Sequence, residues 1–521
     1  MPRESKMGHR KQEFQALPAS ENEVNGEEEE DAKLLAEPVE KQGASDYDDD
    51  GGVLKEDPAK LSLCGEAESL FRLALPMVFG QILNMLGWQV NLVLIGHISA
   101  EALGASAMAR MWMGISAYAI LFGGQMSLDT LRSQAYGAKA YEHVGVLTQR
   151  GIIIVTLLCI PAGISWIWLT APVLRLIGVP DEIAEMAQLY CKVAVGNIWP
   201  MLAQNMAIGF LRCKYMLTHA AIPTTPWFPG IHSDRLLVFP GQRIVKPLTY
   251  LAAATQLITL PVSFYLINTY GFIGGAMAES INGWIMFIST MMLINWKGYH
   301  KKCWHGWSMR AFEDWGPIVK LGAAGSLQSF VQMSSFEFTA AMASTLGAVP
   351  LAAHSCSSNL TFFMFPVVGT TGLMATTVRV GNLLGEGRPK QARLTGKASV
   401  IICTSTVAFC AMLLQVFRED FARIYSGDEE VIAVAASISP QVGGYLIFFG
   451  MVMSFRGTVG GCGKQLQSAR MGTFTWYCVG LPLGALFCFL FDMGLGGLWA
   501  GLCCGGLFQC SCFYIWLRCV L

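Results

Sequence analysis

The sequence predicts an all-α polytopic membrane protein, with twelve transmembrane helices arranged as two parallel six-helix repeats. Of its 521 residues, 53% are hydrophobic and only 14% are charged, whereas soluble domains carry about a quarter charged residues. The mean hydropathy is +0.44. After residue 60, apolar stretches of transmembrane length follow one another along the chain. This composition excludes a soluble enzyme or a nucleic-acid-binding protein, and we expect no enzyme activity.

Residues 1–62 are expected to form a disordered, acidic cytosolic tail. The first 60 residues hold 17 acidic and 8 basic side chains, with acidic runs at 27–31 and 46–50. Such a segment cannot bury enough apolar surface to offset the entropy lost on ordering. It also lacks an apolar h-region, so it is not a signal peptide.

Twelve stretches reach the roughly 20 apolar residues that a helix needs to cross the hydrocarbon core. Numbered as spans one to twelve, they lie near residues 69–95, 103–127, 148–170, 186–212, 248–268, 272–295, 316–346, 351–376, 396–416, 432–455, 471–491 and 495–518. Several contain proline or glycine, which membrane helices tolerate because neighbouring helices satisfy the freed backbone groups.

Lysine and arginine gather in every second loop. The loop after span two carries Arg132, Lys139 and Arg150, and the loop after span six carries Lys297 and Lys301. The loops after spans three and nine are mainly acidic. Because basic loops stay on the cytosolic side, both termini are predicted to be cytosolic, in either the plasma or the vacuolar membrane.

The two halves of the membrane part resemble each other at a fixed offset of 248 residues. Residues 133–137 fall on 381–385, and Gly196 falls on Gly444. Because six helices separate each pair, the repeat is parallel, and a ligand cavity is expected between the two lobes. The predicted domains are a six-helix lobe at 63–296, a cytosolic linker at 297–315 and a second six-helix lobe at 316–521.

An additional segment interrupts this repeat after span four. The offset falls to 222, so the first lobe has 26 more residues, which lie between Cys213 and Pro247. The segment, about 214–241, is too polar to be embedded in a membrane. It is either a long cytosolic loop or a translated intron, because the codons for Cys213-Lys214-Tyr215 can contain a splice-donor sequence. A transcript lacking the segment would establish the second interpretation.

Five glycine-rich motifs occur in a fixed order along the chain, the first three directly after spans one, two and eight. They are Gly96-His97, LDTLRSQAYGA at 128–138, VRVGNLLGEG at 378–387, VGLPLG at 479–484 and GGLWAG at 496–501. Together with the spans and the repeat, these motifs resemble the eukaryotic multidrug and toxic compound extrusion (MATE) family over about residues 65–518. The resemblance implies two six-helix bundles that meet in a V. It also implies secondary active export of organic cations or metabolites, coupled to inward proton or sodium movement.

Glu337, deep in span seven, is the predicted coupling and substrate-binding residue. Burial disfavours the charged form of a carboxyl group, so an intramembrane acid can exchange a proton near physiological pH and attract a cation when ionised. Eukaryotic relatives resemble E-W-W-x-[FY]-E here, and Glu337 falls on the second acid while Gln332 replaces the first. Further acids of animal relatives are also missing, since Ser357 and Phe449 stand near their places. Alternatively, Glu337 only makes hydrogen bonds between helices.

The repeat pairs Glu337 with Gln89 and Gln332 with Asn84. The first lobe therefore presents amides where the second lobe presents an acid. Coupling is accordingly expected in the second lobe, with the amides of span one as candidate lining groups.

Further candidate residues lie in spans four and six. Glu279 is a second buried acid, which either takes part in coupling or pairs with a neighbouring polar group. Gln204 and Asn205 either hydrogen-bond a substrate or bridge helices. Arg379 and Arg132, at the ends of matching helices, are expected to hold the inward gate.

The sequence thus predicts a proton-coupled antiporter that exports organic cations, xenobiotics or metabolites. A sodium-coupled exporter and a lipid-linked sugar flippase of the same superfamily are the alternatives. We expect a monomer in the lipid bilayer, a small-molecule substrate and no nucleic-acid partner. No cofactor or metal is expected, because most of the 16 cysteines lie in apolar runs without a His or Asp partner pattern.

Overall fold

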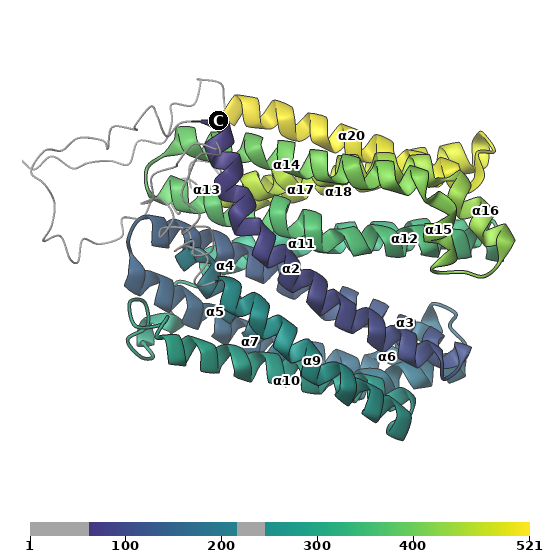
Figure 1. The fold of residues 1–521 in the computed structure, drawn as a ribbon, viewed down its shortest axis with the longest axis horizontal. Helices are drawn as coiled ribbons and strands as arrows, with labels where there is room; N and C mark the ends of the chain where they lie inside the picture. Colours follow the sequence, from purple (N-terminus) through teal and green to yellow (C-terminus); the bar gives the residue numbers. More distant parts are fainter. Residues whose placement is uncertain (1–61, 216–244, 521) are drawn as a thin grey trace, which may run out of the picture. The chain divides into compact units, whose positions relative to one another are not determined.

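A computed structural model describes residues 62–215 and 245–520 of the chain (Figure 1). Within these two ranges the structure is helical and contains no strand, which confirms the all-α fold class. The predicted tail lies outside the described residues except for Ser62. The predicted insertion at 214–241 lies almost wholly outside them too.

Six elements of transmembrane length make up the first half of the described chain. Four are single α-helices, and two are interrupted by a short π-helical turn. They are α2 (Leu63–Gly96), α3 (Ala100–Met113) with η2 (Gly114–Tyr118) and α4 (Ala119–Gly137), α5 (Tyr141–Ile164) with η3 (Ser165–Leu169) and α6 (Thr170–Leu176), α7 (Asp181–Tyr215), α9 (Val245–Tyr270) and α10 (Phe272–Lys297).

The second half repeats this order after a short 3₁₀ turn, η6 (Met309–Phe312). Its elements are α11 (Gly316–Ser344), α12 (Ala348–Val368) with η7 (Gly369–Ala375) and α13 (Thr376–Gly385), α14 (Pro389–Val416), the short α15 (Arg418–Arg423) and α16 (Glu429–Ser437), α17 (Ser439–Gly461), α18 (Gln465–Phe474) with η8 (Thr475–Gly480), α19 (Leu481–Ala485) and η9 (Leu486–Leu490), and α20 (Gly494–Val520).

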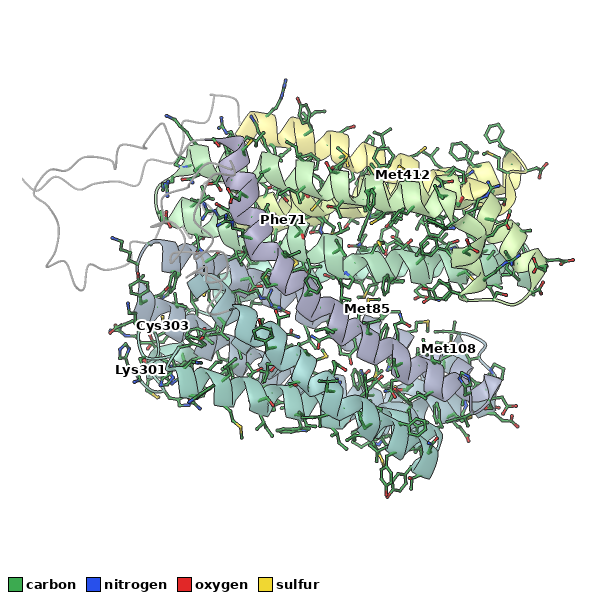
Figure 2. All side chains as sticks on the ribbon, viewed as in Figure 1. Phe71, Met85, Met108, Lys301, Cys303 and Met412 are labelled. Carbon is green, nitrogen blue, oxygen red and sulfur yellow. The ribbon has the colours of Figure 1, made fainter. Side chains whose placement is uncertain are left out.

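Ten of these elements are long and apolar enough to cross a membrane by length and composition. The other two elements of similar length are α7 and α11, whose sequences carry more polar side chains. Together they correspond to the twelve predicted spans. Large apolar side chains such as Phe71 and Met412 are exposed on the outer faces (Figure 2), which suits contact with lipid.

Three predicted boundaries were wrong. Arg132 and Arg150 do not lie in a loop but inside α4 and α5, where both are buried. Their charges are paired or bound to backbone carbonyls, so the helices continue past the end of the apolar stretch. Span ten starts later than predicted, because the chain bends near Ile438, between α16 and α17.

Local sequence explains where several helices start and stop. The Ser62 and Ser99 hydroxyls accept hydrogen bonds from the amides of Gly65 and Ala102, each at 3.0 Å, and so cap α2 and α3. Gly298 ends α10 with φ of 63°, a left-handed conformation that favours glycine.

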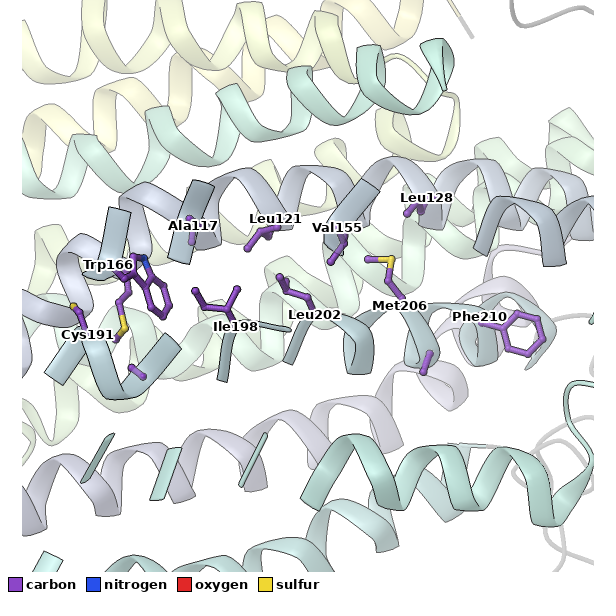
Figure 3. Close-up of a cluster of buried hydrophobic side chains, with 14 of the residues drawn as sticks. Ala117, Leu121, Leu128, Val155, Trp166, Cys191, Ile198, Leu202, Met206 and Phe210 are labelled. Carbon is purple, nitrogen blue, oxygen red and sulfur yellow. The ribbon is translucent and has the colours of Figure 1, made fainter. Parts of the chain in front are cut away.

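The buried apolar side chains form two main clusters. One is built almost wholly from residues between 70 and 318, and the other from residues between 331 and 513. Figure 3 shows part of the first cluster, where Trp166, Ile198 and Met206 lie among neighbouring helices. The exact lobe and linker boundaries stay a prediction.

Several helices contact both halves of the chain. α2 packs against α9 of the first half and α14 of the second (Figure 1). α4 of the first half packs along α11 and α13 of the second, and α11 also packs against α18. Polar groups on α2, α4 and α11 are therefore positioned to connect the two halves.

Candidate functional site

Three acidic side chains lie well within the long helices and a fourth, Glu66, lies buried in the first turn of α2. Three of these four acids are paired with arginine. Glu66 pairs with Arg379, Asp129 with two arginines and Glu279 with Arg110. Glu337 is different, since no other described residue forms an ion pair or hydrogen bond with its carboxylate. It is the acid that is left available for a ligand.

Glu337 lies on α11 and its side chain is exposed. It stands about three helical turns beyond Ser326 on the same face of the helix. The Ser326 hydroxyl donates a hydrogen bond to the carbonyl of Ile120 in α4, at 2.7 Å. The face of α11 that meets the first half of the chain thus continues to Glu337.

Gln332 does not lie beside Glu337, because five residues of helix turn the two side chains to different faces. Its Oε1 instead accepts a short hydrogen bond from Nη1 of Arg456 in α17. Gln332 and Arg456 line a cavity inside the second half of the chain. Sequence reasoning missed Arg456, because it directly follows the predicted end of span ten and no sequence signal shows that it borders a cavity.

Glu279 pairs with a neighbouring polar group, which was one of the two interpretations of its sequence. Its Oε1 lies 3.2 Å from Nη2 of Arg110 in α3, and Tyr190 lies within 3.4 Å of the same guanidinium nitrogen. The Arg110 guanidinium also stacks 5.0 Å from the ring of Trp88. Arg110 was the second arginine that sequence reasoning missed.

The predicted amides are spread over α2 and α7. Asn84 accepts a hydrogen bond from Gln256 of α9 at 3.4 Å, and Gln89 and Asn205 are half-buried. Gln204 is buried, and neither its amide oxygen nor its nitrogen has a partner in the described structure. No hydrogen bond or ion pair between described residues connects any two of the seven predicted site residues, so the structure does not bring them together as one network.

A buried cluster joins the two halves where α2 begins. Glu66 accepts hydrogen bonds from Arg379 at 2.9–3.2 Å, from Thr395 at 2.8 Å and, at shorter range, from Gln391. Glu66 belongs to the first half and its three partners belong to α13 and α14 of the second. We call these four residues the Glu66 cluster, and the end of the helices at which it lies the Glu66 end.

The two halves approach closely at the Glu66 end. Thr130 and Gln134 of α4 donate hydrogen bonds to the carbonyls of Gly460 and Gly461 in α17, both at 2.9 Å. A side chain at Gly137 would lie 2.2 Å from the carbonyl oxygen of Asn382 in α13. This contact is too close for any residue other than glycine, so the halves are tightly apposed here.

Arg132 stabilises the first half from within and makes no contact across the halves that the structure records. Its guanidinium binds Asp129 at 3.0 Å and the carbonyl of Met206 at 2.9 Å. Arg212 also binds Asp129, at 3.2 Å. Of the two arginines expected at the gate, Arg379 is the one that joins the halves.

No cluster of three or more His, Cys, Asp or Glu side chains that could hold a metal ion occurs in residues 62–215 and 245–520. The binding groups that the described structure offers are single acids, arginines and amides.

Ten helical elements that are long and apolar enough to cross a membrane, with two further elements of similar length, define the class as a multi-pass integral membrane protein. The MatE family model matches residues 76–218 and 326–486, which is more than half of the chain. The chain belongs to this family of transporters.

Two similar relatives are multidrug and toxin extrusion protein 1 of rat and of human. The rat protein is 26% identical over 491 residues, covering 93% of this chain and 80% of the relative. The human protein is 27% identical over 451 residues, covering 86% and 74%. Among solved structures, the eukaryotic MATE transporter AtDTX14 matches with a TM-score of 0.77 and 22% identity, over 88% of this chain and 96% of that chain.

Proposed function

We propose that this protein is a secondary active antiporter that exports organic cations or related small solutes in exchange for protons. The observation that carries the proposal is Glu337, an acid in the middle of a transmembrane helix without a partner in the described structure. The names of the similar relatives, multidrug and toxin extrusion proteins, support the class of substrate.

In this mechanism the substrate and the proton compete for one carboxylate. Ionised Glu337 attracts a cationic solute, since an intramembrane carboxylate without a counter-charge gains from a bound cation. Protonation removes the charge and weakens the binding of the solute. Exchange follows if the site opens alternately to the two sides, so that one ligand leaves where the other binds.

We further propose that the Glu66 end faces the cytosol. The basic loops of the sequence lie at this end, as the positive-inside rule requires. The close contacts between α4, α13 and α17 then close the transporter toward the cytosol. Opening at this end would let the solute reach Glu337 from inside the cell.

Two alternative functions of the superfamily fit the described residues less well. Sodium is bound by several oxygen ligands, whereas Glu337 has no other acid in contact within the described structure. A flippase of lipid-linked sugars would favour a large cationic cavity. The cavity beside Arg456 is cationic but has room for about one water molecule.

The test is transport of labelled tetraethylammonium by proteoliposomes under an imposed pH gradient, without sodium. The wild-type protein is expected to move the cation in the direction opposite to the downhill flow of protons. Glu337→Gln is expected to abolish this coupled flux, because a glutamine amide cannot exchange a proton. Glu101→Gln, which removes an exposed acid from the start of α3, is the matched control and should transport normally.

Each other result of this experiment counts against a part of the proposal. Coupled transport by Glu337→Gln would exclude Glu337 as the coupling residue, and Glu279→Gln would then be compared. Flux driven by a sodium gradient but not by a pH gradient would replace proton coupling with sodium coupling. Absence of flux under both gradients would contradict the antiporter itself.

A further inference from the structure

Arg456 is a buried arginine without an acidic partner. It lies in α17, near the end of a transmembrane helix, and its side chain is 5% exposed. Its Nη1 contacts the amide oxygen of Gln332 and, at 3.9 Å, the sulfur of Met453. No carboxylate of the described residues forms an ion pair with it. Burial of such a charge is unfavourable unless another group compensates it.

The walls of the cavity next to Arg456 present further hydrogen-bond donors. The cavity is lined by residues of α11, α17, α18, α20 and η8. Three of its lining groups are buried and have no partner in the described structure, namely Nε of Arg456, Nε2 of Gln328 and the hydroxyl of Tyr445. Buried donors of this kind are normally satisfied, so their convergence on one cavity indicates a missing acceptor.

The backbone at Gly472 leaves room for such an acceptor. A Cβ atom at this position would lie 3.4 Å from Nε2 of Gln509 and 3.6 Å from Nε2 of Gln328. Two amide nitrogens therefore border the same space as Arg456. The amide oxygen of Gln509 also lacks a partner, and an amide can turn to present either end.

The other arginines buried within the helices differ from Arg456 in having an acid. Arg110 pairs with Glu279, Arg379 with Glu66, and both Arg132 and Arg212 with Asp129.

We propose that the Arg456 cavity binds an anion, which is either a small inorganic ion such as chloride or the carboxylate of a solute. An anion would neutralise the guanidinium and accept hydrogen bonds from Gln328 and Tyr445, and hydrogen bonds to charged groups are the strong ones. The cavity admits about one water molecule, so the occupant is a single small ion or the end of a carboxylate group, and the lining side chains must move slightly outward to admit it. The proposal that the cavity binds an anion does not rest on the proposed antiport. The antiport matters only for what the bound anion does in the cell.

The test is the thermal unfolding of the purified full-length protein at increasing chloride or acetate, with isethionate keeping the ionic strength constant. Any ligand that binds the folded state raises the unfolding temperature in a saturable way. The wild type should show this rise with at least one of the two anions. Arg456→Gln should raise the half-saturating concentration about tenfold or more, since it removes a charge-assisted contact, and Arg456→Lys should restore part of the affinity.

Arg393→Gln is the matched control, because it removes the same charge from an exposed position on α14 and should leave the titration unchanged. If Arg456→Gln does not fold, Gln328→Leu keeps the charge and removes one neutral donor, and weaker anion binding is again expected.

Saturation by chloride alone would assign the site to an inorganic anion, and tighter saturation by acetate would assign it to a carboxylate. The absence of saturation by both anions overturns the proposal. So does an unchanged titration of Arg456→Gln or, where that variant does not fold, of Gln328→Leu. Because no transport is measured, this outcome is distinct from failure of the antiporter.

Discussion

Arg110 and Glu279 form an ion pair in the interior of the first half. Both side chains are largely buried, at 9% and 12% exposure, and come from helices α3 and α10. Tyr190 and Trp88 complete the surroundings of the guanidinium. An ion pair buried in this way contributes little net stability by itself, whereas removal of one partner leaves the other charge uncompensated.

Arg110→Leu is therefore expected to lower the free energy of unfolding by about 3 kcal/mol, because it leaves the Glu279 carboxylate without its counter-charge. The double variant Arg110→Leu/Glu279→Leu should recover most of this loss. The measurement is an SDS titration of the purified protein in mixed micelles, read as a double-mutant cycle. A loss in the double variant equal to the sum of the losses of Arg110→Leu and Glu279→Leu alone would show that the two side chains are not coupled.

Glycine permits a close helix crossing between α4 and α11. A Cβ atom at Gly123 would lie 2.0 Å from the backbone nitrogen of Ser326, and one at Gly325 would lie 2.9 Å from the Cα of Gly123. Small residues allow membrane helices to approach this closely. A Cβ atom at the neighbouring Gly124 would have no other atom within 4 Å. Of the two adjacent glycines, Gly123 is therefore the one that the close crossing requires.

Gly123→Ala should separate α4 from α11 and lower the free energy of unfolding by about 1–3 kcal/mol, because the added methyl group meets backbone atoms that cannot move aside. Gly124→Ala should have almost no effect and is the matched control. Thermal unfolding in detergent measures both variants side by side. A loss of the same size in the two variants would show that the close crossing at Gly123 is not its cause, since helix propensity alone would stabilise both variants.

The sequence predicted the twelve spans well because each is a local run of apolar residues. Helix ends were less accurate, since Arg132 and Arg150 are charges that tertiary contacts neutralise inside a helix. Glu337 could be singled out because its position in an apolar run is visible in the sequence. Glu66, Arg110 and Arg456 could not, since their importance depends on which residue of a distant helix lies opposite.

The Glu66 cluster joins parts of the chain that are far apart in sequence. Glu66 begins the first long helix, while Arg379, Gln391 and Thr395 come from the second half. Glu66 is 2% exposed and has no other ion-pair partner in the described structure. If the two halves separate at this end, the cluster must come apart, so it stabilises the closed arrangement.

Glu66→Gln is expected to shift the population toward states that are open at the Glu66 end by tenfold or more, since a loss of about 1.4 kcal/mol is enough. Spin labels at the exposed positions Glu142 and Arg393 should report a longer or broader distance distribution. Glu68→Gln removes an exposed acid that pairs only with Arg72 of its own helix and should leave the distances as in the wild type. An unchanged distribution in Glu66→Gln would mean that the backbone contacts alone hold this end closed.

The unpaired guanidinium of Arg456 has an electrical consequence for the whole cycle. Exchange of one monovalent cation for one proton moves no net charge, so the membrane voltage neither helps nor hinders it. An anion that leaves with the cation makes the outward load neutral, while the returning proton still carries one positive charge inward. Each 100 mV, negative inside, would then add about 2.3 kcal/mol to the driving force. If the proposed proton antiport holds and the anion at Arg456 leaves with the cation, the transporter would therefore use voltage in addition to the proton gradient.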